Sequence, residues 1–139
     1  MTSPATLEVG SGHFYTFKME FLGLRTLIYP TTDLAASRKW WEEFLGVPPY
    51  FAESFYVGFQ VGGHEIGFNP GADMSYGPVT YLGVDSIQDG LAKAEALGST
   101  MVSPIEDVGM GILIVHLMSP TGDRFGLIFN PHSEVDSGK

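Results

Sequence analysis

The sequence predicts an α+β domain that contains two copies of one βαβββ module. Each half has a β-rich run followed by a capped amphipathic helix, and the two helices end in the same Leu-Gly pair, at 45–46 and 97–98. Each half also closes with a strand that runs into Phe-Asn-Pro, at 68–70 and 129–131. A period above about 50 residues with two copies is too long for a solenoid and favours a duplicated module. The simpler alternative is the alternation that any mixed α/β chain shows.

The first module begins with the strand LGLRTLIYP at Leu22 and continues into the helical segment TTDLAASRKWWEEFLG. Thr32 or Asp33 is the natural N-cap of that helix, and Gly46 ends it. Apolar residues recur at helical spacing in this segment: Leu34, Trp41 and Leu45, with Trp40 and Phe44 beside them. Three short strands follow, the last two joined by a Gly-Gly hairpin turn: 49–54, 55–61 and 64–69.

The second module repeats this order after the polar loop at 70–78. A strand at 79–84 leads into SIQDGLAKAEALG, where Ser86 and Asp89 form a capping-box-like pair and Gly98 ends the helix. The apolar stripe of this helix comprises Ile87, Leu91, Ala94 and Leu97. Three more strands follow, the last two joined by a Ser-Pro-Thr-Gly turn: 100–106, 111–118 and 123–129.

These elements predict one domain of two modules, at 21–70 and 78–131, between an N-terminal arm at 1–20 and a C-terminal tail at 132–139. The length of 139 residues, with 44% hydrophobic and 17% charged residues, is typical of a globular domain. The chain has no cysteine and no apolar run of membrane-spanning length, so we expect a cytoplasmic protein without membrane contact. A net charge of −9 leaves no basic patch for phosphates, which argues against nucleic-acid binding.

Three phrases of the sequence are similar to those of a known family: TLIYPTTDLAASRKWWEEFLG, VTYLGVDSIQDGLAKAEALG and SPTGDRFGLIF. They resemble the opening strand and helix, their second-module counterpart, and the final turn and strand of the vicinal oxygen chelate superfamily. That superfamily includes glyoxalase I, bleomycin-resistance proteins and extradiol dioxygenases. The resemblance covers residues 22–131. It implies two βαβββ modules whose sheets form a cup with the helices outside.

The resemblance also implies where a metal would lie. Enzymes of the family hold a divalent ion in the cup on His from the first strand and Glu from the last strand of each module. The His positions align with Thr26 and Val79, and the second Glu position aligns with Gly126. The first Glu position aligns with Gly67, or with Glu65 if Phe-Asn-Pro is matched to Phe-Asn-Pro. Because catalysis needs about three protein ligands, we expect no catalytic metal, and we expect no other cofactor.

The histidines offer one open question. His13 lies in the arm, His132 in the tail, and His64 is adjacent to Glu65, so its side chain is expected on the other face of its strand. The face on which His116 lies depends on the hairpin register. We interpret it as a half-buried histidine whose ring nitrogens are hydrogen-bonded.

Alternation from the aligned positions predicts the residues that face the cup and bind the ligand. The set comprises Thr26, Ile28, Glu65, Gly67, Val79, Tyr81, Arg124 and Gly126. An apolar floor with a few polar groups is typical of a small-molecule pocket. The glycines remove volume where a ligand approaches, or they only permit twist and bulges. Glu65 and Arg124 either form a salt bridge at the rim or act as a general base and an anion clamp, respectively. Tyr81 either contacts the ligand or packs in the core.

The leading hypothesis is a homodimeric protein that binds an organic small molecule in the cup without a catalytic metal. Trp40 and Trp41 are expected in the core and in the subunit interface. The alternative is a divalent-metal-dependent lyase or dioxygenase of the same superfamily with a displaced ligand set, such as Glu65, His116 and groups from a second chain. A third class is a structural or partner-binding module with a collapsed cup.

Overall fold

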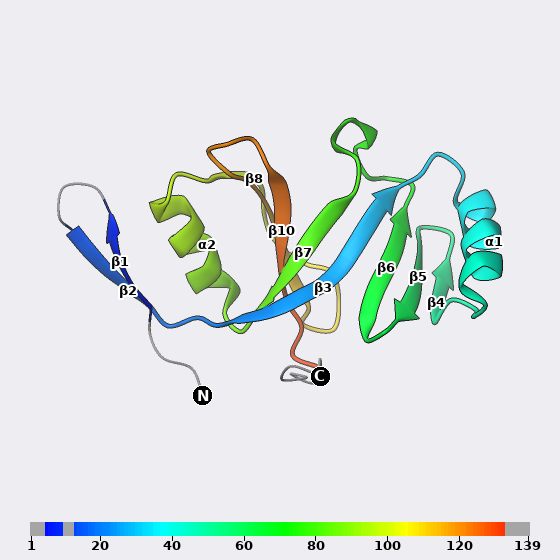
Figure 1. Ribbon diagram of the computed structural model, residues 1–139, viewed down its shortest axis with the longest axis horizontal. Coiled ribbons are helices and arrows are strands. Elements are labelled where there is room, and N and C mark those ends of the chain that lie inside the picture. The colour runs from blue at the N-terminus through cyan, green and yellow to red at the C-terminus, as the bar shows by residue number, and fades with distance from the viewer. Residues whose placement is uncertain (1–4, 10–12, 133–139) are drawn as a thin grey trace. The chain divides into compact units, whose positions relative to one another are not determined.

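The computed structural model describes residues 5–9 and 13–132. Two compact units divide the chain: residues 25–80, which we call the α1 unit, and residues 1–24 with 81–139, which we call the α2 unit. Each unit contains one helix and its own antiparallel strands (Figure 1). The predicted α+β class with two βαβββ modules is confirmed, whereas the predicted cup between the modules and the exact domain boundaries stay predictions.

The α1 unit has the element order of the first predicted module. Its elements are β3 (Phe21–Pro30, in this unit from Arg25), α1 (Leu34–Leu45), β4 (Phe51–Glu53), β5 (Tyr56–Val61) and β6 (His64–Asn69). The strands lie in the order β4-β5-β6-β3, with β3 parallel to β6 and the other pairs antiparallel. The strand expected at 49–54 is shorter than predicted, because Pro48 and Pro49 have no N–H to donate to a ladder. The loop that follows β6 contains a short 3₁₀ helix, η1 (Met74–Tyr76).

Local sequence signals account for the ends of these elements. Asp33 is the N-cap of α1, since its carboxylate accepts a hydrogen bond from the N–H of Ala36 at 3.0 Å. Gly46 ends the helix with a φ of 77°, in the left-handed region that favours glycine. The β5–β6 turn likewise uses two glycines with positive φ, 57° at Gly62 and 85° at Gly63, which is the conformation that a two-residue hairpin demands.

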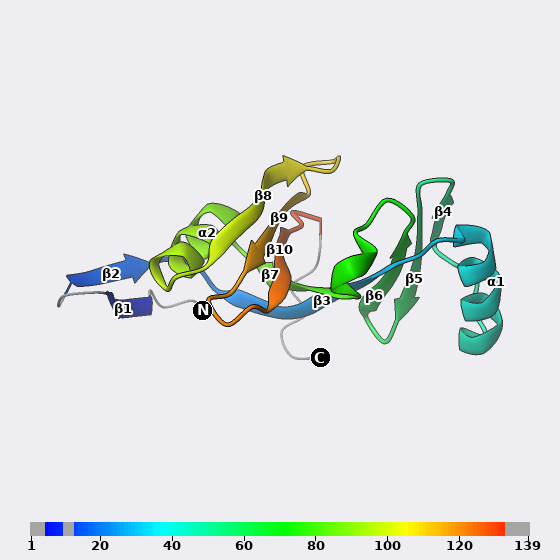
Figure 2. The same ribbon diagram turned by 90° about the horizontal axis from the view of Figure 1, so that it is seen from above.

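One face of the α1-unit sheet is covered by α1 (Figure 2). The buried residues on this face are Val57, Phe59 and Phe68. The ring centroid of Trp41, from the helix, lies 5.4 Å from that of Phe68. Trp41 is therefore a core residue, as expected. Trp40 is 55% exposed and does not belong to this core, because it lies on the outer side of the helix.

The α2 unit contains the second predicted module and the N-terminal segment. Its elements are β1 (Ala5–Val9), β2 (His13–Phe17), β7 (Val79–Val84, in this unit from Tyr81), α2 (Ile87–Ala96), β8 (Thr100–Asp107), β9 (Leu113–Met118) and β10 (Arg124–Phe129). The strands of the module lie in the order β7-β10-β9-β8, with β10 parallel to β7 and antiparallel to β9. β8 pairs with β9 through two register shifts, on either side of Ser103.

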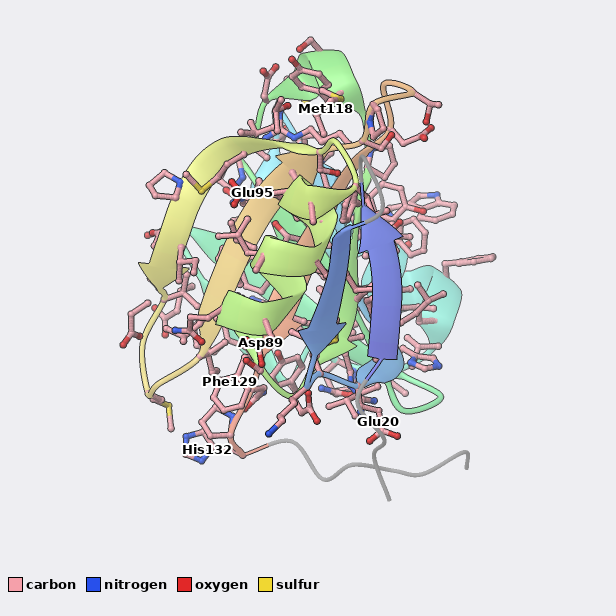
Figure 3. All side chains as sticks on the ribbon, turned by 90° about the vertical axis from the view of Figure 1, so that its left-hand side faces the viewer. Glu20, Asp89, Glu95, Met118, Phe129 and His132 are labelled. Atoms are coloured by element: carbon pink, nitrogen blue, oxygen red, sulfur yellow. The ribbon has the colours of Figure 1, made fainter. Side chains whose placement is uncertain are left out.

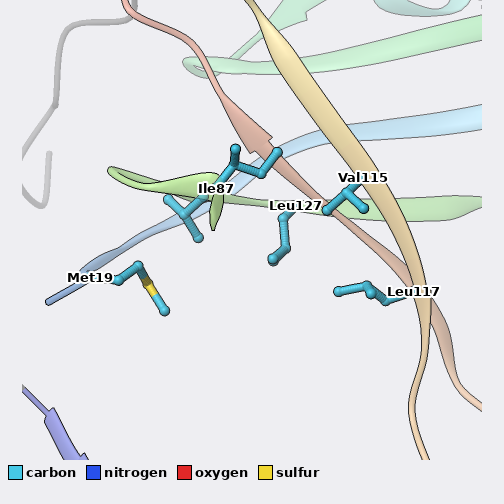
Figure 4. Close-up of a cluster of buried hydrophobic side chains, with 6 residues drawn as sticks. Met19, Ile87, Val115, Leu117 and Leu127 are labelled. Carbon is cyan, nitrogen blue, oxygen red and sulfur yellow. The ribbon is translucent and has the colours of Figure 1, made fainter. Parts of the chain in front are cut away.

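The core of the α2 unit lies between α2 and this sheet. It comprises Met19, Val84, Ile87, Val115, Leu117 and Leu127 (Figure 4). Met19 reaches this core because the chain beside it is fixed to the start of the helical segment: the Asp85 N–H donates to the Glu20 carbonyl at 3.2 Å, and the Glu20 N–H donates to the Asp85 carboxylate at 2.7 Å. Met19, which lies within the expected arm, is thus part of the fold.

The segment expected as an arm contains the antiparallel strands β1 and β2, which the sequence analysis had not assigned. They lie beside α2 in Figure 3. The 133–139 part of the expected tail lies outside the described residues. Within the described ranges, neither helix has the length and apolar character that a membrane crossing requires.

Candidate functional site

The α1 unit gathers several of the predicted site residues on the face of its sheet that α1 does not cover. The register pairs Thr26 with Glu65 and Ile28 with Gly67, and it pairs Gly67 in turn with Gly58 of β5. Directly paired residues point to the same face of a sheet. The neighbouring positions in each strand, such as Phe68, point into the core under the helix. The predicted alternation of Thr26, Ile28, Glu65 and Gly67 on one face is therefore found within this unit.

Two hydroxyls hold the carboxylate of Glu65, which shares this face with Glu53 of β4. The Thr26 hydroxyl donates to Oε1 at 3.1 Å, and the Tyr50 hydroxyl donates to Oε2. Burial, followed by the hydrogen bond to Glu65, raises the pKa of Tyr50 above its ordinary value. The phenol therefore stays protonated over the physiological range and remains a donor to the carboxylate.

Two glycines create the space in which these groups lie. A Cβ atom at Gly67 would stand 2.5 Å from Cζ of Tyr56 and 2.8 Å from Cδ1 of Ile28. A Cβ atom at Gly58 would stand 2.7 Å from the Glu65 carboxylate and 2.9 Å from the Tyr50 ring. Both glycines are thus required by close approach, because the rings and the carboxylate lie directly on the backbone.

Aromatic side chains extend from this point along β4 and β5. The Phe51 ring centroid lies 6.4 Å from that of Tyr50, 6.0 Å from that of Phe55 and 6.2 Å from that of Tyr56. Tyr50 is 56% exposed, Phe51 is 38% exposed and Phe55 is 63% exposed. We call these four residues, Tyr50, Phe51, Phe55 and Tyr56, the aromatic cluster. It presents exposed ring surface beside the Glu65 carboxylate.

The α2 unit holds a second polar group on its sheet, centred on His116. Gly126 of β10 pairs with Tyr81 on one side and with His116 on the other, so the three residues form one row across the sheet. The Tyr81 hydroxyl is hydrogen-bonded to Nε2 of His116, and the Ser103 hydroxyl lies 2.9 Å from Nδ1. His116 therefore shares a face with Tyr81 and Gly126, which answers the question that the sequence left open. The interpretation of a half-buried, hydrogen-bonded histidine is confirmed.

His116 is neutral at physiological pH. Burial lowers its pKa from the ordinary value, the positive charge of Arg124 lowers it further, and the carboxylate of Glu106 acts in the opposite direction. Arg124 starts β10 two residues before Gly126 and lies on the same face. A neutral imidazole has one donor and one acceptor nitrogen, and here the two neighbouring hydroxyls use both.

Gly126 lies beneath an aromatic ring, as Gly67 does in the other unit. A Cβ atom at Gly126 would stand 2.5 Å from Cε2 and 3.2 Å from Cγ of Tyr81. Each glycine is followed by a buried core residue, Phe68 in the α1 unit and Leu127 in the α2 unit. This pattern favours the alignment of Gly67 with Gly126 over the alignment that matches Phe-Asn-Pro to itself.

Comparison with solved structures gives similar folds at low sequence identity. A hypothetical protein from Bacillus halodurans has a TM-score of 0.68 at 12% identity, covering 84% of this chain and 97% of that chain. Methylmalonyl-CoA epimerase from Mycobacterium tuberculosis has a TM-score of 0.64 at 15% identity, covering 77% and 87%. The Mn(II)-bound glyoxalase from Novosphingobium aromaticivorans has a TM-score of 0.61 at 19% identity, covering 80% of this chain and 40% of that chain. No protein-family model matches the sequence, and no curated protein matches it.

The chain has the vicinal oxygen chelate fold. The comparisons establish the fold alone at these identities. The chemistry of this chain must therefore be judged from its own side chains.

The positions that the sequence resemblance aligns with the metal ligands of the vicinal oxygen chelate enzymes hold no carboxylate or imidazole in this chain. A threonine hydroxyl and a valine stand at the first-strand positions, Thr26 and Val79. In the alignment that burial favours, glycine stands at both last-strand positions, with Glu65 two residues before Gly67. Aromatic rings fill the space where carboxylates would project from Gly67 and Gly126. Among residues 5–9 and 13–132, no group of three or more histidine, aspartate or glutamate side chains is arranged to hold an ion. The residues at these positions do not fit a catalytic divalent metal.

Several members of the two polar groups are not among the residues predicted from the sequence. Tyr56 could have been found, since alternation in β5 places it on the same face as Gly58. Tyr50 precedes its strand and is positioned by the hydrogen bond from its N–H to the Gly58 carbonyl at 3.0 Å, for which the sequence holds no signal. Ser103 lies opposite His116 because of the register shifts in β8, which no feature of the sequence predicts. Val79 is buried in β7. The Glu65–Arg124 ion pair stays a prediction, because its two residues belong to different units.

Proposed function

We propose that this protein binds an organic small molecule on the uncovered sheet faces of its modules and does so without a catalytic metal. The single observation that carries the proposal is the substitution of the family's metal-binding positions. Thr26, Val79, Gly67 and Gly126 offer no carboxylate or imidazole, and tyrosine rings occupy the space above the two glycines. The eight predicted ligand-binding residues remain part of the proposal.

The groups that the structure adds support binding of an organic molecule. Sites for small organic ligands combine aromatic and apolar surface with a few fixed polar groups. The aromatic cluster supplies exposed rings, and Glu65 supplies a fixed charge beside them. His116 adds no metal-binding nitrogen, because Tyr81 and Ser103 are hydrogen-bonded to its two ring nitrogens.

A homodimer and a cytoplasmic location belong to the same proposal. Trp40 and Phe44 of α1 stack with a centroid distance of 4.9 Å, and they are 55% and 67% exposed. Val47, 42% exposed, follows the same helix. Exposed large apolar side chains that lie together are typical of interaction surfaces. The chain has no cysteine that an oxidising compartment could pair, which supports the location.

Elemental analysis and a ligand survey test the function together. We expect purified protein to contain no stoichiometric Zn, Ni, Fe or Mn, and to bind members of a panel of small aromatic compounds in ligand-observed NMR after treatment with a chelator. Tyr50→Ala should weaken that binding, whereas Leu97→Ala, an exposed truncation in the other unit, should not. About one metal ion per chain, with binding lost on chelation, would overturn the proposal in favour of a metal-dependent enzyme. The absence of any binding from the panel would overturn it as well.

A further inference from the structure

Glu65 is a fixed carboxylate without a cationic partner in its own unit. All residues from 25 to 80 are described, and the arginine, lysine and histidine residues among them are Arg25, Arg38, Lys39 and His64. Within residues 25–80, the one ion pair joins Arg38 and Glu42 at 3.5 Å on the surface of α1. Within residues 25–80, the groups that contact the Glu65 carboxylate are the two neutral hydroxyls of Thr26 and Tyr50.

The hydroxyls orient this carboxylate and leave it able to accept more. Each Glu65 oxygen receives one O–H donor, and a carboxylate oxygen has a second lone pair. Thr26 is 8% exposed and is the strand partner of Glu65 in the β3–β6 ladder, so its hydroxyl is held beside the carboxylate. The negative charge is thereby held in one place on the sheet, with its accepting capacity unfilled.

Aromatic rings surround the same point. The Tyr50 ring and the Glu65 carboxylate both lie over Gly58, and the Tyr56 ring lies over Gly67 and Gly58. Phe51 and Phe55 continue the ring surface outward. The faces of aromatic rings carry negative electrostatic potential, and they attract ammonium groups by about 0.5–2 kcal/mol per ring at exposed to desolvated sites. A carboxylate beside exposed aromatic side chains is an arrangement that can recognise an organic cation.

We infer that Glu65 and the aromatic cluster bind an organic cation, of the alkylammonium or quaternary ammonium class attached to an apolar or aromatic body. The inference rests on the proposed function and names its ligand class. The ammonium group contacts the Glu65 carboxylate, and the apolar body lies on the rings of Tyr50 and Phe51.

The charge of the chain favours a cation over an anion. Within residues 25–80 three basic side chains, Arg25, Arg38 and Lys39, stand against six acidic ones: Asp33, Glu42, Glu43, Glu53, Glu65 and Asp73. The whole chain carries −9 at pH 7. A negative field concentrates cations at the surface and repels anionic ligands.

Three soluble probes of related shape test the charge of the ligand: benzyltrimethylammonium, benzyl alcohol and benzoate. Dissociation constants are measured for the full-length protein by NMR titration. We expect the cation to bind most tightly, benzyl alcohol less tightly and benzoate least. The affinity for the cation should fall as NaCl is raised, whereas that for benzyl alcohol should not, because salt screens the attraction between charges.

Variants locate the site. Glu65→Gln keeps the size of the side chain and removes its charge. It should weaken the binding of benzyltrimethylammonium by about tenfold or more, and the affinity for benzyl alcohol should change less. Glu43→Gln removes the same charge from an exposed position on α1 and should leave the affinity within about twofold. Tyr50→Leu removes an aromatic ring and should weaken the binding of benzyltrimethylammonium by about threefold to tenfold.

The outcomes separate this inference from the function on which it rests. If benzyl alcohol or benzoate binds at least as tightly as the cation, or if Glu65→Gln and Glu43→Gln behave alike, the cation assignment is overturned and small-molecule binding stands. If none of the three probes nor the wider panel binds, both fail. If Glu65→Gln does not fold, the test is how the affinity of the unmodified protein for benzyltrimethylammonium changes with salt. An affinity that does not change with salt overturns the assignment.

Discussion

Replacing Gly126 with alanine is expected to destabilise the α2 unit, because the new methyl group would collide with the Tyr81 ring. A Cβ atom at this position stands 2.5 Å from Cε2 and 3.2 Å from Cγ of Tyr81, well inside ordinary contact distance. The ring has little freedom to move away. Tyr81 is 8% exposed, and its hydroxyl is hydrogen-bonded to His116.

Two effects of opposite sign set the magnitude. Alanine reduces the entropy of the unfolded chain, which stabilises a protein by about 0.4–1 kcal/mol when the site accepts the methyl group. Forcing an extra carbon into a packed site costs about 1–3 kcal/mol. We therefore expect a net loss of about 1–2 kcal/mol in the free energy of unfolding, or about 3–8 °C in Tm for a chain of this size.

Equilibrium unfolding in urea, followed by tryptophan and tyrosine fluorescence, measures this loss. Gly71→Ala is the matched control, since a Cβ atom there has only one neighbour within 4 Å, the Asn69 amide oxygen at 3.4 Å. The double variant Gly126→Ala with Tyr81→Leu removes the ring that causes the collision. Its loss should be smaller than the sum of the two single losses, because contacting residues are not additive.

Unchanged or increased stability of Gly126→Ala would refute the reasoning. So would additive losses in the double variant. Either result would mean that the glycine serves the twist of β10 and not the approach of the ring.

Three further predictions concern other parts of the chain. Tyr50→Phe should lower the free energy of unfolding by about 1 kcal/mol, because Glu65 loses a hydrogen-bond donor. Urea unfolding should show a smaller loss when the same substitution is made in a Glu65→Gln background, and equal losses would contradict the hydrogen bond. The pKa of His116 lies below its ordinary value of 6.5 in the folded chain, so the unfolded chain gains a proton first and stability falls as the pH drops through about 6.5. His116→Gln should remove that part of the slope in urea unfolding between about pH 8 and pH 5, and an identical slope would count against it. Trp40→Ser with Phe44→Ser should convert the proposed dimer to a monomer in sedimentation velocity, whereas Leu97→Ser should not; an unaltered dimer would place the interface elsewhere.

The site illustrates how far strand alternation carries a prediction. Alternation correctly placed Thr26, Ile28, Glu65 and Gly67 on one face, because the side-chain period of a strand is fixed by backbone geometry. It could not place His116, since the face on which a residue lies in a hairpin depends on register, and register depends on contacts between strands. The repeated Phe-Asn-Pro suggested an alignment that burial disfavours: Phe68 is buried, whereas Leu127, and not Phe129, holds the corresponding position.

The roles of Gly67 and Gly126 show the same division. Their presence in strands was visible in the sequence, and both a ligand approach and simple twist could explain it. The structure shows a third reason, namely that the Tyr56 and Tyr81 rings lie on these glycines. A partner that belongs to another strand cannot be read from local sequence.

The sequence by itself determined the two βαβββ modules, their capped helices, and the identity of the residues that the resemblance aligns with metal ligands, because caps, periodicity and residue identity are local properties. Tertiary structure alone decided that Tyr50 and Thr26 hold Glu65, that Ser103 and Tyr81 hold His116, and that rings cover the two glycines. Those contacts join residues up to 45 positions apart, such as Tyr81 and Gly126. They exist because strand pairing brings distant segments into register, and that register is set by the packing of the whole unit.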